Sequence, residues 1–327
     1  MTDAPRTTTP PATTVAAATA QPPPMGRLAR AWDSDLLWSF RHSPLAMGAG
    51  AVTAFFMLIA LFAPWIAPQN AFDPASLNLM DGFLEPMTRS DAGNLHVMGT
   101  DNQGRDLLSA ILFGSRVSII VGFLSVAFSL LLGVSLGLIA GFVGGRTDAI
   151  IMRIADIQLS FPAILIALLV FGIVRGFIHP SQHEQWALGV LIVAIGLANW
   201  ARYARTVRGS TMVEKNKEYV QAARVMGRSS FAIMREHVLP NVMGPILVIA
   251  TINLALAIIE EATLSFLGVG VPPTQPSLGT LIRIGQQFLF SGEWWILMFP
   301  GLALVLLALA INLLGDWLRD ALNPKLK

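Results

Sequence analysis

The chain has 327 residues, of which 54% are apolar and only 13% are charged. Soluble domains carry about 25% charged residues, so this composition indicates an integral membrane protein rather than a soluble enzyme domain. The formal net charge of +2 is too small to indicate a nucleic-acid partner, and the lack of any cysteine excludes disulfides, thiolate metal sites, cysteine catalysis and thiol-linked lipids.

The N-terminal region has the composition of a tail. Residues 1–24 are mainly Thr, Ala and Pro, which cannot bury enough apolar surface to offset the entropy of ordering, so this segment is predicted to be disordered. Residues 25–45 are predicted to form an amphipathic segment on the membrane surface, with Trp32 and Trp38 at the level of the lipid headgroups. The leader before the first apolar run is too long for a cleaved signal peptide, so that run is expected to be a retained span.

Six windows without charged residues are candidates for membrane-spanning helices, each of which needs about 20 residues. They cover residues 43–72, 117–145, 157–174, 185–201, 238–259 and 294–315. The third window is short, so its helix is expected to begin earlier, near Asp148, and to include Arg153 and Asp156. The chain is therefore predicted to be all-α and polytopic, with six transmembrane helices.

Three glycines lie one helical turn apart in the second window, at Gly133, Gly137 and Gly141. This spacing could be mistaken for a nucleotide-binding loop. Inside a span, however, it provides a small-residue face along which two helices can pack closely. We therefore predict a helix-packing face.

Charge is distributed unevenly between two polar connections. Residues 202–237 hold eight Lys or Arg against three Glu, whereas residues 68–115 hold two Arg against six acids. By the positive-inside rule the basic connection is cytoplasmic. With six spans, both chain termini lie on the cytoplasmic side and the connection 68–115 is external.

The basic connection contains a predicted helical hairpin. Residues 215–226 are strong helix formers, Gly227 allows a sharp turn, and Ser229 or Ser230 can cap a second helix. That helix is expected to run to about Val238, before the fifth span.

A solvated connector is the simplest interpretation of this hairpin, but two features argue against it. The hairpin is longer than the usual connection between helices. In addition, the small residues Ala222, Ala223 and Gly227 would let another protein approach closely.

The hairpin resembles the cytoplasmic signature of ABC-importer permeases, which is Glu-Ala-Ala, three residues, Gly, nine residues, Ile, any residue and Leu-Pro. The residues that match are Ala222, Ala223, Gly227, Leu239 and Pro240, with Gln221 in place of glutamate and His237 in place of isoleucine. The branch that handles peptides and nickel has similar "YVQAAR" and "LPN" forms. The resemblance implies that residues 202–240 are the coupling loop that docks in a groove of an ATPase subunit.

Three further stretches narrow the resemblance to the C-type subunit of dipeptide, oligopeptide and nickel permeases. They are residues 98–118, residues 261–281 with Leu278 where tryptophan is more usual, and residues 312–326 with Asn323 where aspartate is common. The resemblance runs from about Trp38 to the C-terminus, and residues 46–327 are assigned to the transmembrane domain. It implies the permease subunit of a bacterial inner-membrane importer, partnered by a homologous permease, two ATPases and an external substrate-binding protein.

The sequence has no Gly-x4-Gly-Lys-Ser/Thr phosphate loop, so we expect no ATP hydrolysis by this chain, no enzymatic activity and no cofactor. His179, His183 and Glu184 have the spacing of zinc ligands, but Pro180 and the loop setting favour exposed polar residues over a metal site.

The acidic residues before the second span do not fit a calcium-binding loop. Asp101, Asn102 and Asp106 are too few and wrongly spaced for an EF-hand. A capped amphipathic helix on the outer face, beginning at Thr100 or Asp101, is expected instead.

Glu260 and Glu261 follow the fifth window. The apolar run from residue 238 to residue 271 is too long for one upright span, so the pair is expected near its outer end, in contact with water. The alternative places Glu261, which matches the family motif, in the translocation path, where intramembrane carboxylates tend to mark substrate routes and could attract a peptide's ammonium group.

These observations predict a binding-protein-dependent importer of short peptides. A nickel-chelate permease of the same family is the alternative that the sequence does not separate. A stand-alone secondary carrier would show internal repeats with broken helices at matching positions, and no convincing repeat is present. A membrane enzyme would need convergent polar residues inside the spans, and none are found.

Overall fold

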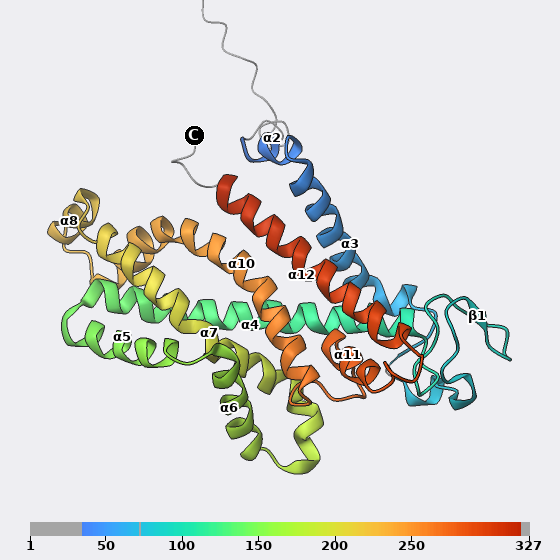
Figure 1. Ribbon diagram of the computed structural model, residues 1–327. Helices are drawn as coiled ribbons and strands as arrows, with labels where there is room; N and C mark the ends of the chain where they lie inside the picture. Colours follow the sequence, from blue (N-terminus) through green and yellow to red (C-terminus); the bar gives the residue numbers. More distant parts are fainter. Residues whose placement is uncertain (1–34, 72, 322–327) are drawn as a thin grey trace, which may run out of the picture.

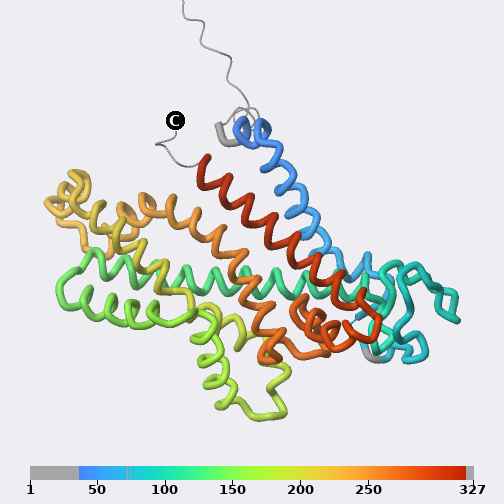
Figure 2. The backbone as a smooth tube through the Cα atoms, viewed as in Figure 1, coloured from blue at the N-terminus to red at the C-terminus, as the bar shows by residue number. Residues whose placement is uncertain are grey.

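The structure is a computed structural model that describes residues 35–71 and 73–321. The predicted tail, residues 1–24, and Trp32 lie outside this part of the chain. The described residues form a bundle of long helices, with helix α8 at one end and the small β1–β2 hairpin at the other (Figures 1 and 2). These are called the α8 end and the β1 end below.

Among the described residues, five helices are long and apolar enough to cross a membrane. They are α3 (Pro44–Ile66), α4 (Leu107–Val143), α7 (His183–Glu214), α10 (Leu239–Phe266) and α12 (Trp295–Ala321). A sixth crossing is present if the bent pair α5 (Gly145–Leu159) and α6 (Ala163–Gly176) is taken as one span. The all-α, polytopic prediction is confirmed.

The prediction of one continuous third helix is wrong. Arg153 and Asp156 are helical, as expected, but α5 ends at Leu159 and α6 leaves it at an angle of 101°. Pro162 lies at the break, where it lacks an N–H for the helix ladder and disfavours helical backbone at the residue before it. Two ion pairs, Arg208–Asp148 at 2.5 Å and Arg205–Asp156 at 2.6 Å, hold α5 along α7 instead.

The glycine face is confirmed as a close helix contact between α4 and α7. A Cβ atom at Gly137 would lie 2.5 Å from the carbonyl oxygen of Ala204, and one at Gly141 would lie 2.7 Å from Cβ of Thr211. Both distances are far below van der Waals contact, so only glycine lets the two backbones approach this closely. This contact places the α8 end of α7, and the hairpin that follows it, against α4.

The shorter elements lie mostly in the connections between the long helices. The connection between α3 and α4 contains η1 (Pro74–Ser76), η2 (Leu79–Asp81), β1 (Thr88–Arg89) and β2 (Leu95–His96), while η3 (Pro180–Gln182) precedes α7 and α11 (Leu278–Gln286) lies between α10 and α12 in the chain. The α8 end contains α8 (Glu218–Val225), α9 (Ser230–Ile233) and the π-helical segment η4 (Met234–Val238), whereas α2 (Asp35–Arg41) lies apart from it, beside α3 and α12 (Figure 1). Trp38, on α2, is 63% exposed.

The helix expected to begin at Thr100 or Asp101 begins later. Asp106 caps α4 by accepting a hydrogen bond from the Ser109 N–H at 2.8 Å, and α4 continues unbroken into the second span. Thr100 donates to the carbonyl oxygen of Asp81 at 2.6 Å and accepts from the N–H of Leu84. Thr100 and Asp101 therefore fold the loop, and the capping role falls to Asp106.

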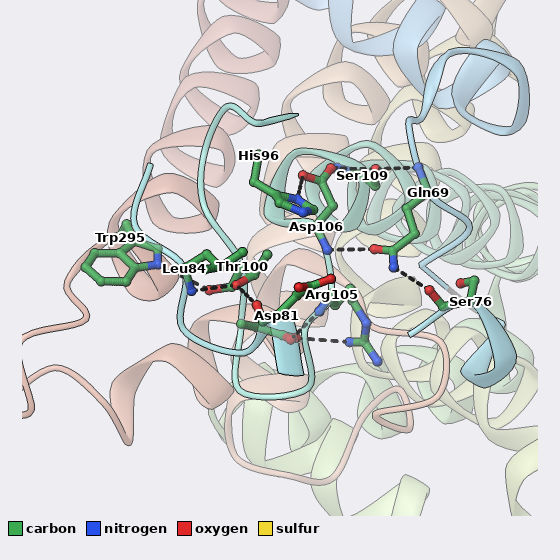
Figure 3. A network of polar contacts seen from close by, with 11 residues as sticks. Gln69, Ser76, Asp81, Leu84, His96, Thr100, Arg105, Asp106, Ser109 and Trp295 are labelled. Atoms are coloured by element: carbon green, nitrogen blue, oxygen red, sulfur yellow. Dashed lines mark hydrogen bonds and ion pairs between the residues drawn. The ribbon is translucent and has the colours of Figure 1, made fainter. Parts of the chain in front are cut away.

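A buried polar network fastens this loop to the bundle (Figure 3). Asp106 contacts His96 at 3.0 Å, while its own N–H donates to Gln69 at 2.7 Å. Trp295 of α12 donates to the carbonyl oxygen of Thr100. Burial raises the pKa of Asp101, because desolvation outweighs the attraction of Arg105 and two backbone N–H groups.

Candidate functional site

The hairpin at the α8 end is built around a defined helix stop. Gly227 has a φ of +78°, its N–H donates to Arg224, and the N–H of Arg228 donates to Ala223. These two bonds form a Schellman motif, in which glycine takes up the left-handed conformation that other residues avoid. Ser229 then accepts a hydrogen bond from the N–H of Ala232 and caps the next helix. The predicted turn at Gly227 and the predicted cap are confirmed.

The hairpin occupies only part of the polar segment 202–240, because the helices on either side of the hairpin extend into this segment. Residues 202–214 continue α7, and the second arm of the hairpin runs through α9 and η4 directly into α10. Leu239 and Pro240 are the first residues of α10, where the missing N–H of proline is tolerated. The hairpin is therefore carried directly on the ends of two long helices.

The expectation that Ala222, Ala223 and Gly227 all face a partner is wrong for one of them. Ala222 and Gly227 are exposed, and a Cβ at Gly227 would meet nothing within 4 Å. Ala223 is only 1% exposed. Its methyl group belongs to a buried cluster with Val220, Ile233, Val238, Phe142, Tyr203, Val207, Val242 and Ile246. Ala223 is small because α8 packs against its own chain.

Polar contacts hold α8 in this position. Tyr219 donates to Glu214 at the end of α7 and accepts from the side-chain amide of Asn241 in α10 at 3.2 Å. Partial burial and the neighbouring Glu214 carboxylate raise the pKa of Tyr219 to about 12, so its hydroxyl keeps its proton. Arg228 and Glu236 form an ion pair at 3.0 Å across the turn. Gln221 is exposed and donates to the carbonyl oxygen of Lys215.

An apolar tip was missed by the sequence analysis. Val225 is 89% exposed, Met226 is 75% exposed and Phe231 is 68% exposed, and all three flank the Gly227 turn. The signal was present as three large apolar residues inside an otherwise basic hairpin. An exposed apolar group rimmed by charges is typical of a protein contact surface.

Glu261 is enclosed by protein rather than by water. It has no exposed surface, accepts a hydrogen bond from Ser118 of α4 at 2.6 Å, and accepts another from Ser265 at 2.7 Å. The two serines in turn accept hydrogen bonds from the N–H groups of Leu278 and Val271. The expectation that Glu261 contacts water is wrong for this chain, because these hydroxyl groups replace the solvent. Glu261 fastens the segment that follows α10.

Glu260 lies on a different face of α10. It is partly exposed and accepts a hydrogen bond from Asn199 of α7 at 2.7 Å. The histidines after α6 make local contacts only. His183 bonds to the carbonyl oxygen of Ile178 and to Arg175, and His179 bonds to Ser181. No cluster of three metal-ligating side chains occurs within residues 35–71 and 73–321.

A bundle of apolar helices with a polar hairpin at one end defines a polytopic membrane protein. The family described as "binding-protein-dependent transport system inner membrane component" matches residues 133–327, and "N-terminal TM domain of oligopeptide transport permease C" matches residues 31–86. The chain belongs to this family of inner-membrane transport components.

Relatives from several bacteria cover most of the chain. The di/tripeptide transport system permease protein DppC of Pseudomonas aeruginosa is 39% identical over 88% of this chain and 91% of its own length. The dipeptide permease DppC of Haemophilus influenzae is 40% identical over 83% of this chain and 87% of its own length. The probable D,D-dipeptide permease DdpC of Escherichia coli is 35% identical over 89% of this chain and 91% of its own length.

A solved structure shows the same fold. A chain of the MetNI methionine ABC transporter in an inward-facing conformation superposes with a TM-score of 0.53 at 20% identity, covering 66% of this chain and 98% of that chain. The family match and the permease relatives together show that this protein is a multi-pass permease of the ABC-importer type.

Proposed function

We propose that the chain is the translocation subunit of an importer for short peptides, powered by ATPases that are separate proteins. The observation that carries the proposal is the hairpin at the α8 end. Its exposed tip, Val225, Met226 and Phe231, stands on two helices that reach the opposite end of the bundle. Its relatives are named as permeases of dipeptide and di/tripeptide transport systems, which supports short peptides as the substrate class.

The proposed assembly contains a second, homologous permease, two ATPase subunits and an external binding protein that delivers the peptide. The α8 end, with both termini, lies in the cytoplasm, and the β1 end lies outside. The excess of Lys and Arg in residues 202–237 and the acids of residues 68–115 support this orientation. The chain itself contributes no catalytic group.

Nucleotide-driven closure of the ATPases would draw the hairpins together and shift the bundle from inward-open to outward-open. Such a shift requires contacts that differ in free energy between the two states. ATP binding supplies that difference, and the tip residues, whose apolar surface is buried while an ATPase is docked, transmit it to the bundle.

The test is peptide uptake together with co-purification of the ATPases. Phe231→Asp should leave the permease in the membrane, reduce the ATPases recovered with it and abolish dipeptide uptake. Phe177→Asp is the control for ATPase recovery, because Phe177 follows α6, away from the hairpin, and is even more exposed than Phe231, at 88% against 68%. Normal ATPase recovery and normal uptake with Phe231→Asp would refute the docking role.

The substrate is tested separately. Cells that depend on this importer should take up dipeptides, and uptake of a nickel chelate in place of dipeptides would refute the peptide assignment. A position of Glu261 in the translocation path stays a prediction, and its enclosure by Ser118 and Ser265 favours a structural role instead.

A further inference from the structure

A cavity of about 430 Å³ opens at the end of the bundle opposite α8. One wall comes from α6, η3 and the start of α7, and the other from the segment after α10 and from α11. Its volume lies in the range of roughly 300–1,000 Å³ that is typical of small-molecule sites. The predicted coupling residues and Glu261 are not among its lining residues.

Two arginines from opposite walls line the cavity. Arg175 lies near the end of α6, with its guanidinium carbon 5.9 Å from the centre of the Phe171 ring. Its Nε–H donates to Nδ1 of His183 at 3.3 Å. Nε2 of His183 is 2.8 Å from the carbonyl oxygen of Ile178 and must carry the ring proton. Both ring nitrogens of His183 are thus engaged in local hydrogen bonds.

Arg283, on α11, reaches the cavity from the other wall. Its guanidinium lies against the turn that ends α10, since a Cβ at Gly268 would be 3.1 Å from Nη1. The C-terminal end of a helix favours a cation, which accounts for the position of the side chain. Its Nε is enclosed and has no hydrogen-bond partner among the described residues. Because Nε has no accessible surface, a ligand in the cavity would pair with the terminal Nη groups of Arg283 rather than with Nε.

The charges of the cavity do not balance. Within the described chain, no carboxylate forms an ion pair with Arg175 or Arg283. The one acid in the lining, Glu184, accepts a hydrogen bond from Thr274. Two guanidinium groups against one carboxylate leave a net positive site.

We propose that this cavity binds the C-terminal carboxylate of a short peptide at the outer mouth of the permease. Guanidinium groups bind carboxylates through paired N–H donors, and two arginines line this cavity. The apolar lining, including Phe171, Ala187 and Val271, receives the adjoining side chain. The inference rests on the peptide substrate proposed above.

The experiment uses a single reporter thiol. Because the chain has no cysteine, Ser181→Cys introduces one thiol at the cavity wall, and mass spectrometry of the peptide that contains it separates it from any thiol of the partner subunits. The complete assembly in lipid nanodiscs is treated with small anionic and cationic methanethiosulfonates. We expect the anionic reagent to react several-fold faster, and Arg283→Gln to bring the two rates together. Arg89→Gln, the same change on the β1 strand, should leave the preference intact.

Protection identifies the ligand. Dialanine should slow modification at residue 181 several-fold, whereas dialanine amide, which lacks the carboxylate, should not. N-acetyl-dialanine should protect as well as dialanine, since the carboxylate is the recognised group. Equal protection by dialanine and its amide, protection by neither, or equal protection by inorganic phosphate would overturn the proposal.

Transport by the unmodified assembly separates this inference from the proposed function. If dialanine is imported but does not protect the thiol, the cavity proposal alone fails. If dialanine is not imported, the substrate assignment fails, whatever the charge preference of the cavity.

Discussion

Ala222 and Ala223 are adjacent and chemically identical, yet the structure predicts opposite consequences for the same substitution. Ala223 is 1% exposed inside an apolar cluster, whereas Ala222 faces outward. Ala223→Asp places a carboxyl group among Val220, Ile233 and Val238, with no partner for its charge. Ala222→Asp places the same group in water.

The free-energy cost of Ala223→Asp is the cost of keeping the buried carboxyl group protonated. Keeping the introduced carboxyl neutral at pH 7 requires raising its pKa from about 3.9 to above 7, which costs about 4 kcal/mol at 1.36 kcal/mol per unit. Because the folded-state pKa would be raised, the penalty is absent below about pH 4 and grows as the pH rises. Local opening of α8 relieves it, and 4 kcal/mol corresponds to an increase of up to about 1,000-fold in the open population.

Trypsin cleavage in inside-out vesicles measures that opening, since Arg224 and Arg228 flank the turn. We expect cleavage of Ala223→Asp to be at least tenfold faster than that of the unmodified chain, with the difference shrinking toward low pH. Cleavage of Ala222→Asp should be unchanged, while its recovery of ATPases falls. If the two variants are cleaved at the same rate, the packing of α8 described above is incorrect.

Three further predictions follow from the same structure. Gly137→Ala should lower the melting temperature of the purified assembly, because overpacking costs about 1–3 kcal/mol. Gly172→Ala, which has nothing near its Cβ, should leave the melting temperature unchanged. Equal melting temperatures for the two variants would refute the close contact of α4 and α7. Glu261→Gln should reduce uptake of free and N-acetylated peptides equally, because the carboxylate is enclosed by Ser118 and Ser265; a selective loss for peptides with a free amine would place Glu261 in the path. An external-only reporter should be active when fused at Asp91 and inactive at Lys215, and activity at Lys215 would overturn the six-span orientation.

The long helices could be predicted from the sequence because charged residues bound the apolar windows. The predicted window 238–259 lies within α10 apart from its first residue, and the window 294–315 likewise lies within α12 apart from its first residue. The break at Pro162 had a local signal in the proline itself, but its 101° angle depends on the packing of α5 against α7. No local rule gives that packing.

The side on which a residue faces was harder to predict. Ala222 and Ala223 differ in burial because Ala223 lies on the same face of α8 as Val220, three residues earlier, and that face packs into the buried cluster. Glu261 receives a hydrogen bond from Ser118, which is 143 residues away in the chain. A carboxylate near the end of a span favours water when only its neighbours in sequence are considered. Its partner comes from another helix, so the enclosed site could be found only from the folded chain.

Helix α10 connects the proposed docking hairpin to the proposed peptide site. Its first turn, Leu239 and Pro240, continues the second arm of the hairpin, and its last turns carry Glu261 and lead to Gly268 at the cavity wall. The hydrogen bonds of Glu261 fix the end near the cavity to α4, while the opposite end carries an exposed apolar tip. A force on the tip therefore acts on a helix held at its far end, so the helix must either bend or tilt about that anchor. Pro245 and the π-helical segment η4 both weaken the regular hydrogen-bond ladder near the tip. Bending of α10 is therefore easiest near Pro245. A displacement of the hairpin changes the cavity only if the part of α10 after Pro245 tilts as a rigid unit about Glu261.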